Sequence, residues 1–206
     1  GGVTSRKLPY IVVELLQGHS LRQVVVKKGA IPPQFAASYA WQALQGLSAA
    51  HAQGIFHRDL KPANLMLEPS PGPVERVVLI DFGFASLIGE ERLTKANHVV
   101  GSLAYMAPER LEGDPGSVGA DLYAIGVILY ELLAGRRPFL ADDEMQLIEK
   151  QLTEEPTPLR ELMGDRPLPA SLEAVAMKAL NKDPKQRAAD ALAMAADIEA
   201  AMKDLT

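Results

Sequence analysis

The chain has 206 residues, of which 48% are hydrophobic and 23% charged, so it is long enough for one large domain with a buried core. This composition is typical of a globular protein and excludes disordered and fibrous classes. With 21 Lys and Arg against 26 Asp and Glu, the net charge is -5, and there is no basic surplus for nucleic acid or an anionic membrane. The absence of cysteine excludes disulfides and thiolate metal sites, and we expect a cytoplasmic location.

The first half of the chain predicts a mixture of short strands and one long helix. Residues 10–15 form a β-branched run entered through Pro9 and predict a strand. Small and apolar residues recur at three- and four-residue steps over 36–50, behind two prolines, and predict an amphipathic helix. Residues 65–67 and 77–80 predict two small strands, which the Pro- and Gly-rich turn between them would join as a hairpin.

The second half predicts helices after a long loop. Residues 83–108 show no sustained period, and a loop of this length in a compact domain usually has a function. Residues 119–134 are apolar nearly all round, which indicates a buried helix, and the run is too short to cross a bilayer. Further helices are predicted at about 142–152, 171–180 and 190–202.

One polar run carries the chemistry. Residues 57–64 read His-Arg-Asp-Leu-Lys-Pro-Ala-Asn, and Asp-Phe-Gly begins at Asp81, after the second small strand. These residues resemble the catalytic and metal-binding loops of protein kinases. The resemblance implies phosphoryl transfer, which needs a group that accepts a hydroxyl proton, a cation on the transferring phosphate, and oxygen ligands for Mg²⁺. Asp59, Lys61, and the pair of Asn64 with Asp81 would supply these roles in that order.

The resemblance to protein kinases extends beyond these two loops. Further matches follow in order: Ala-Pro-Glu ends at Glu109, Asp121 opens the buried helix, and Arg187 lies near the end of the chain. In kinases the equivalents of Glu109 and Arg187 form a buried ion pair, and the equivalent of Asp121 holds the backbone of the catalytic loop. The chain is therefore identified as a member of the eukaryotic-type (Hanks-type) serine/threonine kinases, and the sequence of its motifs is similar to that of bacterial members.

The resemblance implies an α+β protein-kinase-like fold, here a mainly helical C-terminal lobe with a few short strands. Residues 1–18 would be the last strand of the N-terminal lobe and the hinge, and residues 19–206 the C-terminal lobe. Within it lie the catalytic loop at 57–64, the activation segment at 81–109 and a helical subdomain at 118–206. No glycine-rich loop is found, so we expect the N-terminal lobe to be mostly absent and this chain alone to be inactive.

Two details favour serine or threonine as the acceptor: Lys61 itself, and the Gly-Ser step that ends at Ser102. Small-molecule phosphotransferases share a His-x-Asp-x-x-x-x-Asn loop but lack an Ala-Pro-Glu segment and normally lack this Lys. The alternative function is a catalytically silent kinase-like binding or scaffold module. The intact set of polar residues favours the enzyme, because a scaffold has no physical need for all of them: Asp59, Lys61, Asn64 and Asp81.

The resemblance also implies the ligands, ATP and Mg²⁺ (or Mn²⁺). Val13, Glu14 and Leu16 would form the gatekeeper and hinge that contact adenine, and Met66 the floor beneath it. Asn64 and Asp81 would hold the metal. The expected partner is a protein substrate with a Ser or Thr acceptor, with no nucleic acid and no membrane contact, and self-association through an exposed apolar face is a further expectation.

A phosphorylation switch is expected in the long loop. Thr94 is the leading acceptor, with Ser86 and Ser102 as further candidates, and Arg58 would pair with the added phosphate. Ser86 stands where the family often has Lys or Arg, which weakens that phosphate pocket.

Overall fold

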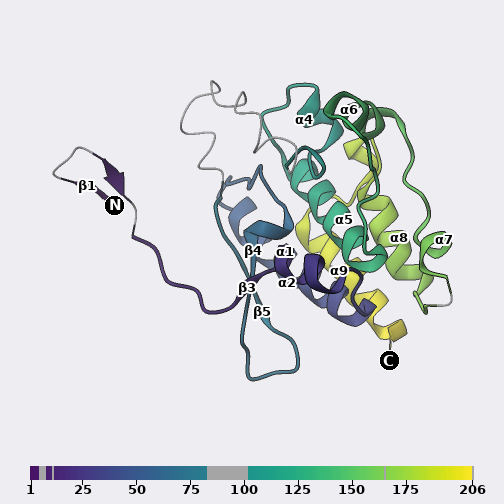
Figure 1. The fold of residues 1–206 in the computed structure, drawn as a ribbon, viewed down its shortest axis with the longest axis horizontal. Helices are drawn as coiled ribbons and strands as arrows, with labels where there is room; N and C mark the ends of the chain where they lie inside the picture. The colour runs from purple at the N-terminus through teal and green to yellow at the C-terminus, as the bar shows by residue number, and fades with distance from the viewer. Residues whose placement is uncertain (5–7, 11, 83–101, 165, 206) are drawn as a thin grey trace.

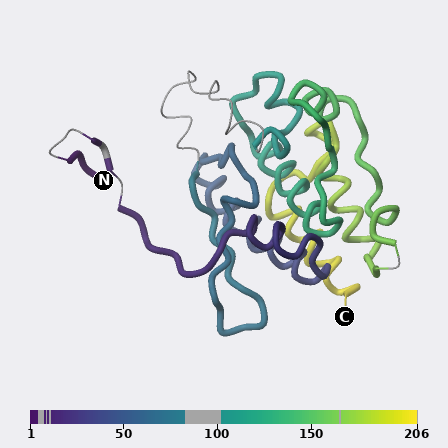
Figure 2. The backbone as a smooth tube through the Cα atoms, viewed as in Figure 1, coloured from purple at the N-terminus to yellow at the C-terminus, as the bar shows by residue number. Residues whose placement is uncertain are grey.

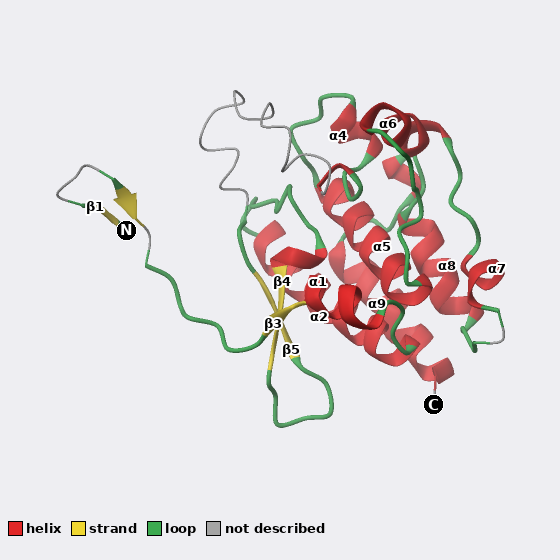
Figure 3. Ribbon diagram, in the orientation of Figure 1, coloured by secondary structure: helices red, strands yellow, loops and turns green. Residues whose placement is uncertain are grey.

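The computed structural model describes residues 1–4, 8–10, 12–82, 102–164 and 166–205. Most of these residues form one helical body, and β1 and β2 lie away from it (Figures 1 and 2). The other strands lie together on one side of the helices (Figure 3). None of the helices in the described part of the chain could span a membrane.

The strands form two small antiparallel sheets. One pairs β1 with β2, and the other has the order β3-β4-β5. The predicted hairpin is confirmed, with Met66 of β4 opposite Val78 of β5 and Ser20 of β3. The bounds are Gly2–Val3 for β1, Pro9–Tyr10 for β2, His19–Ser20 for β3, Leu65–Glu68 for β4 and Arg76–Leu79 for β5.

The strand predicted over residues 10–15 is wrong for residues 12–15. Residues 12–17 have no regular structure, and Val12, Val13 and Leu15 expose 77%, 78% and 84% of their surface. Strand propensity acts through packing against neighbouring strands, and β1, the partner of β2, is only two residues long. The β-branched run therefore has no described strand against which to form a ladder.

The helices follow the predicted pattern in the second half of the chain and add several short ones. The long helices over 36–50 and 119–134 are confirmed, as are the three later ones, with ends shifted by at most three residues. The bounds are Leu21–Lys28 for α1, Pro33–His51 for α2, Pro108–Leu111 for α4, Val118–Ala134 for α5, Glu144–Thr153 for α6, Leu159–Met163 for α7, Ala170–Ala179 for α8 and Ala191–Met202 for α9, with single 3-10 turns η1 (Pro62–Asn64), η4 (Pro184–Gln186) and η5 (Lys203–Leu205).

Helix α1 was not predicted, because it contains three consecutive valines, which lose side-chain freedom in a helix. Burial of Leu21, Val24 and Val25 against the body holds it in place. Its first turn is closed by Ser20, whose backbone N–H donates to Gln23 Oε1 at 2.8 Å.

Helix α5 forms the centre of the core, and its residues from Ala120 to Leu133 are buried on every side. It packs against α2 and α8, and α9 covers both α2 and α8. A Cβ at Gly126 would lie 2.6 Å from the Cβ of Ala179, so only glycine allows α5 to approach α8 this closely. The helix ends at Gly135, whose φ of 77° and N–H bond to the Glu131 carbonyl make a left-handed cap.

Candidate active site

The loop that carries the predicted catalytic residues runs from the end of α2 to β4, and Asp121 holds it from the first turn of α5. The Asp121 carboxylate accepts the backbone N–H groups of His57 at 2.9 Å and Arg58 at 3.0 Å. The His51 Nε2 atom lies 2.9 Å from Asp121 Oδ2 and donates to it. Arg58 has a φ of 66°, a conformation that costs a side-chain-bearing residue about 1–3 kcal/mol. The carboxylate of Asp121 thus offsets the strain of this turn.

The three predicted catalytic residues meet one another and Ser102 near the end of this loop. Lys61 Nζ donates to Asp59 Oδ2 at 2.7 Å and to Ser102 Oγ at 2.8 Å. Asn64 is buried, and its Nδ2 donates to the Asp59 carbonyl at 2.8 Å. The Asp59 side chain remains 39% exposed, so a carboxylate held in place by a cation faces solvent.

The Asn64 amide has a fixed orientation. Because the Asp59 carbonyl can only accept, the nitrogen of the amide must face it, and Oδ1 occupies the other arm. An amide oxygen is one of the ligands that Mg²⁺ accepts in proteins. The hydrogen bond from Nδ2 therefore anchors Asn64, and Oδ1, an atom of the type that binds Mg²⁺, lies on the other arm of the amide.

Contacts with the end of β5 bring Asp81 to this loop. The fully buried His57 donates from Nε2 to the Ile80 carbonyl at 2.9 Å, and the Ile80 N–H donates to the Asn64 carbonyl at 3.0 Å. The His57 and Phe82 rings lie 4.7 Å apart. Asp81, between these two contacts, is exposed and has a φ of 59°.

The fit of this site to a metal depends on Asp81 and Asn64. Among the described residues there is no group of three or more His, Cys, Asp or Glu that could hold a metal ion by itself. One carboxylate and one amide oxygen fit Mg²⁺, which typically takes few protein ligands and completes its shell with water and substrate phosphates.

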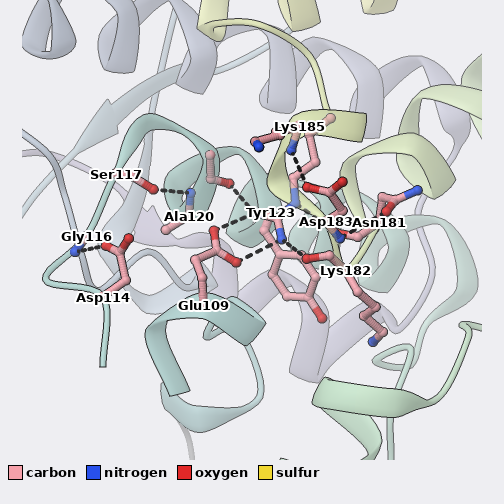
Figure 4. A network of polar contacts seen from close by, with 12 residues as sticks. Glu109, Asp114, Gly116, Ser117, Ala120, Tyr123, Asn181, Lys182, Asp183 and Lys185 are labelled. Carbon is pink, nitrogen blue, oxygen red and sulfur yellow. Dashed lines mark hydrogen bonds and ion pairs between the residues drawn. The ribbon is translucent and has the colours of Figure 1, made fainter. Parts of the chain in front are cut away.

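The predicted pair of Glu109 and Arg187 is present in the structure. Glu109 lies in a network of polar residues that includes Asn181 and Lys182 (Figure 4). Arg187 donates from Nη1 at 2.6 Å and from Nη2 at 2.9 Å to the two carboxylate oxygens of Glu109, and the arginine side chain has no exposed surface. The guanidinium also lies 4.9 Å from the Tyr123 ring centre. Its remaining donors bond to the carbonyls of Gly119, Asn181 and Lys182. All five N–H groups of a buried cation are therefore satisfied, which keeps α4 tied to α5 and to the chain before η4.

Three of the predicted adenine-binding residues precede β3, the strand that pairs with β4. Val13 and Glu14 are exposed and Leu16 is half-buried in the segment that leads to β3. The Gln17 N–H donates to Glu68 Oε1 at 2.8 Å, so this segment is anchored at the end of β4, the strand that carries Met66. No described contact joins Val13 or Glu14 to the catalytic loop.

The predicted regulatory residues are only partly described. Thr94 and Ser86 lie outside the described residues, as does the glycine that follows Phe82. Ser102 accepts from Lys61, and Arg58 lines a small pocket beside Asp59 and Ser102.

Sequence reasoning missed a buried contact next to that pocket. Tyr105, which lines it, donates from its hydroxyl to Glu131 Oε2 at 2.6 Å, and Arg22 of α1 lies 3.8 Å from the other oxygen of Glu131. Burial and the Glu131 charge raise the pKa of Tyr105, so it stays a neutral donor. Glu131, a charged residue within the apolar stretch of α5, was the available signal.

The sequence has matches among known protein families and curated proteins. A family model described as the protein kinase domain matches residues 3–199. Serine/threonine-protein kinase PknB of Mycobacterium leprae is 36% identical over 192 residues, which is 93% of this chain and 30% of that protein. Serine/threonine-protein kinase pkn3 of Myxococcus xanthus is 36% identical over 199 residues, 95% of this chain and 36% of that protein. The chain thus spans about a third of the length of these relatives.

Proposed function

This chain belongs to the protein kinase family, as a bacterial Hanks-type member, and we propose that it is the catalytic lobe of a serine/threonine protein kinase. The reaction is transfer of the γ-phosphoryl group of ATP to Ser or Thr hydroxyls of proteins. The observation that carries the proposal is the bridge made by Lys61, which bonds to Asp59 and Ser102 at 2.7 and 2.8 Å. It places a cation beside a solvent-facing carboxylate, as phosphoryl transfer requires.

Asp59 is proposed to orient the acceptor hydroxyl and take up its proton. The Lys61 ammonium and the Asn64 amide hold the residue from two directions, and the exposed carboxylate remains accessible to a substrate. The charge of Lys61 would in addition stabilise the transferring phosphate. The contact with Ser102 fixes this charge beside the end of the activation segment.

Asn64 and Asp81 are proposed to hold Mg²⁺ on the phosphates of ATP. When bound, the ion neutralises charge that develops on the phosphates. The protein's part is to present the two oxygen ligands, and the backbone bond between Ile80 and Asn64 keeps their chain segments together. Val13, Glu14, Leu16 and Met66 are proposed to contact the adenine.

The domain boundaries and the switch remain proposals of the same kind. Residues 1–18 would contribute the last strand of an N-terminal lobe and the hinge, and residues 19–206 the C-terminal lobe. Phosphorylation of Thr94, paired with Arg58, would regulate the enzyme.

A silent binding module is the second candidate, and two observations favour it for residues 1–206 alone. This sequence contains no Gly-x-Gly-x-x-Gly, and Val13 and Glu14 of the proposed hinge are exposed. Without a cover over the nucleotide, water is not excluded from the phosphates. We therefore propose that residues 1–206 by themselves transfer no phosphate.

A phosphotransfer assay tests the proposal. Residues 1–206 and a longer chain that includes the upstream residues of the same gene are incubated with Mg²⁺, γ-labelled ATP and a generic basic protein, and Asp59→Asn in the longer chain is the control. We expect labelling only with the longer wild-type chain, and a Kd for MgATP of about 1 mM or weaker for residues 1–206. No labelling by the longer chain would support the silent module, and labelling by residues 1–206 would show that they hold a complete site.

A further inference from the structure

Gln151, on the last turn of α6, is a polar side chain with no exposed surface. A buried amide is costly unless both of its arms are hydrogen-bonded. Its Nε2 donates to the Leu103 carbonyl at 2.9 Å, and its Oε1 accepts a short bond from the Tyr123 hydroxyl. The Leu103 carbonyl can only accept, so this contact requires the nitrogen on that side and fixes the orientation of the amide.

The partner of this amide is next to the candidate active site. Leu103 directly follows Ser102, whose Oγ accepts from Lys61 Nζ at 2.8 Å. The turn that contains both residues has its own backbone bonds: Tyr105 N–H donates to the Ser102 carbonyl at 3.1 Å, and Met106 N–H to the Leu103 carbonyl at 3.0 Å. The Gln151 side chain adds a bond that ties this turn to α6.

Gln151 is itself held by two neighbours, Lys182 and Tyr123. Lys182 Nζ donates to the Gln151 carbonyl at 2.8 Å and lies 4.1 Å from the centre of the Phe139 ring. On the other side, the ring of Tyr123 lies beneath the guanidinium of Arg187, at 4.9 Å. The Gln151 amide is thus connected through Tyr123 to Arg187, the buried partner of Glu109.

We propose that Gln151 is a positioning residue for phosphoryl transfer. It holds Leu103, and thereby Ser102, where the serine hydroxyl receives Lys61 and keeps its ammonium beside Asp59. The inference deepens the proposed function and rests on it, because the position of Lys61 matters only if Lys61 acts on a phosphate. An apolar residue at this place would fill the space but could not bond to the Leu103 carbonyl.

Amide hydrogen exchange on residues 1–206 tests the anchoring without any need for activity. Gln151→Met keeps an unbranched side chain of similar volume and removes the N–H donor. We expect the Met106 amide to exchange about tenfold faster, the effect of losing one buried hydrogen bond. Two variants are the controls: Ile198→Val removes a buried methylene in α9, and Tyr123→Phe leaves the bond between Gln151 and Leu103 intact. Unchanged exchange at Met106 in Gln151→Met, or an equal increase in Ile198→Val, would overturn the inference.

Steady-state kinetics of the longer chain tests the link to catalysis. Gln151→Met should lower kcat about tenfold while the KM for MgATP stays within about twofold, and Ile198→Val should change neither. A normal kcat together with faster exchange would show that Gln151 has a structural role alone. Absence of phosphotransfer by the wild-type chain would overturn the proposed function, and the exchange data would then still decide the anchoring.

Discussion

Arg187 donates two hydrogen bonds, of 2.6 and 2.9 Å, to Glu109, which lies 78 positions earlier in the chain. Because the arginine side chain has no exposed surface, removing its partner leaves a buried charge uncompensated. We expect Glu109→Gln or Arg187→Met to lower the free energy of unfolding by about 3–5 kcal/mol each, and the double variant by less than their sum.

Chemical denaturation of the four chains measures this coupling. The exposed pair of Lys178 and Asp197, at 3.0 Å, is the matched control, and its loss should cost less than about 1 kcal/mol. Additive, small losses for Glu109 and Arg187 would contradict the buried pair.

The two carboxylates of the candidate site should fail in different ways. In the longer chain, Asp59→Asn should lower kcat at least about a hundredfold and leave the Kd for MgATP nearly unchanged, because Asp59 is assigned to the acceptor hydroxyl. Asp81→Asn should instead weaken binding of MgATP, because it replaces the negative charge of the proposed metal ligand with a neutral amide. Calorimetric titration and initial rates separate the two effects, and near wild-type turnover of Asp59→Asn would remove that residue from its role.

Asp121 should be essential to the backbone of the catalytic loop. The Asp121 carboxylate accepts three hydrogen bonds, from His57 N–H, Arg58 N–H and His51 Nε2. In Asp121→Asn one of the two oxygens becomes an NH₂ group, which would face a donor instead of accepting from it. We expect a loss of about 1–3 kcal/mol in thermal or denaturant unfolding. Asp143→Asn, at the exposed N-cap of α6, makes the same chemical change and should cost less than about 0.5 kcal/mol. Equal effects of the two substitutions would show that the Asp121 contacts stabilise the fold no more than an exposed helix cap does.

Because of Glu173, we expect the free energy of unfolding to fall at acid pH. Burial alone would raise the pKa of Glu173, but the side chain and backbone N–H of Arg160 hold it below its ordinary value of 4.5. A carboxyl with a lowered folded-state pKa contributes its full stability above pH 4.5, and the contribution disappears as the pH falls through the lower value.

The difference in unfolding free energy between the wild type and Glu173→Gln should therefore be largest near neutral pH and shrink toward pH 3. Denaturation at a series of pH values measures it, with Glu199→Gln on the exposed face of α9 as the control. A difference that does not change with pH would contradict a stabilising Glu173 carboxylate. The exposed Arg160 side chain limits the size of the effect.

Features that repeat or cluster within a short stretch could be predicted from the sequence. Helices α2 and α5 have long hydrophobic patterns, and the hairpin of β4 and β5 brackets a turn rich in Pro and Gly. The candidate catalytic residues lie within a few positions of one another, so their shared chemistry is visible before folding. Asp59, Lys61 and Asn64 are also in contact in the structure.

Strand pairing, burial and buried hydrogen bonds depend on residues distant in the sequence, so only the tertiary structure determined them. The β-branched run after Tyr10 has strand propensity but no described strand to pair with, whereas α1 forms despite its three valines because the body buries Val24 and Val25. Glu131 and Gln151 find their partners 26 and 48 positions away, in Tyr105 and in Leu103. A buried polar group is stable only where folding supplies its hydrogen bonds, and no local pattern records which residue will supply them.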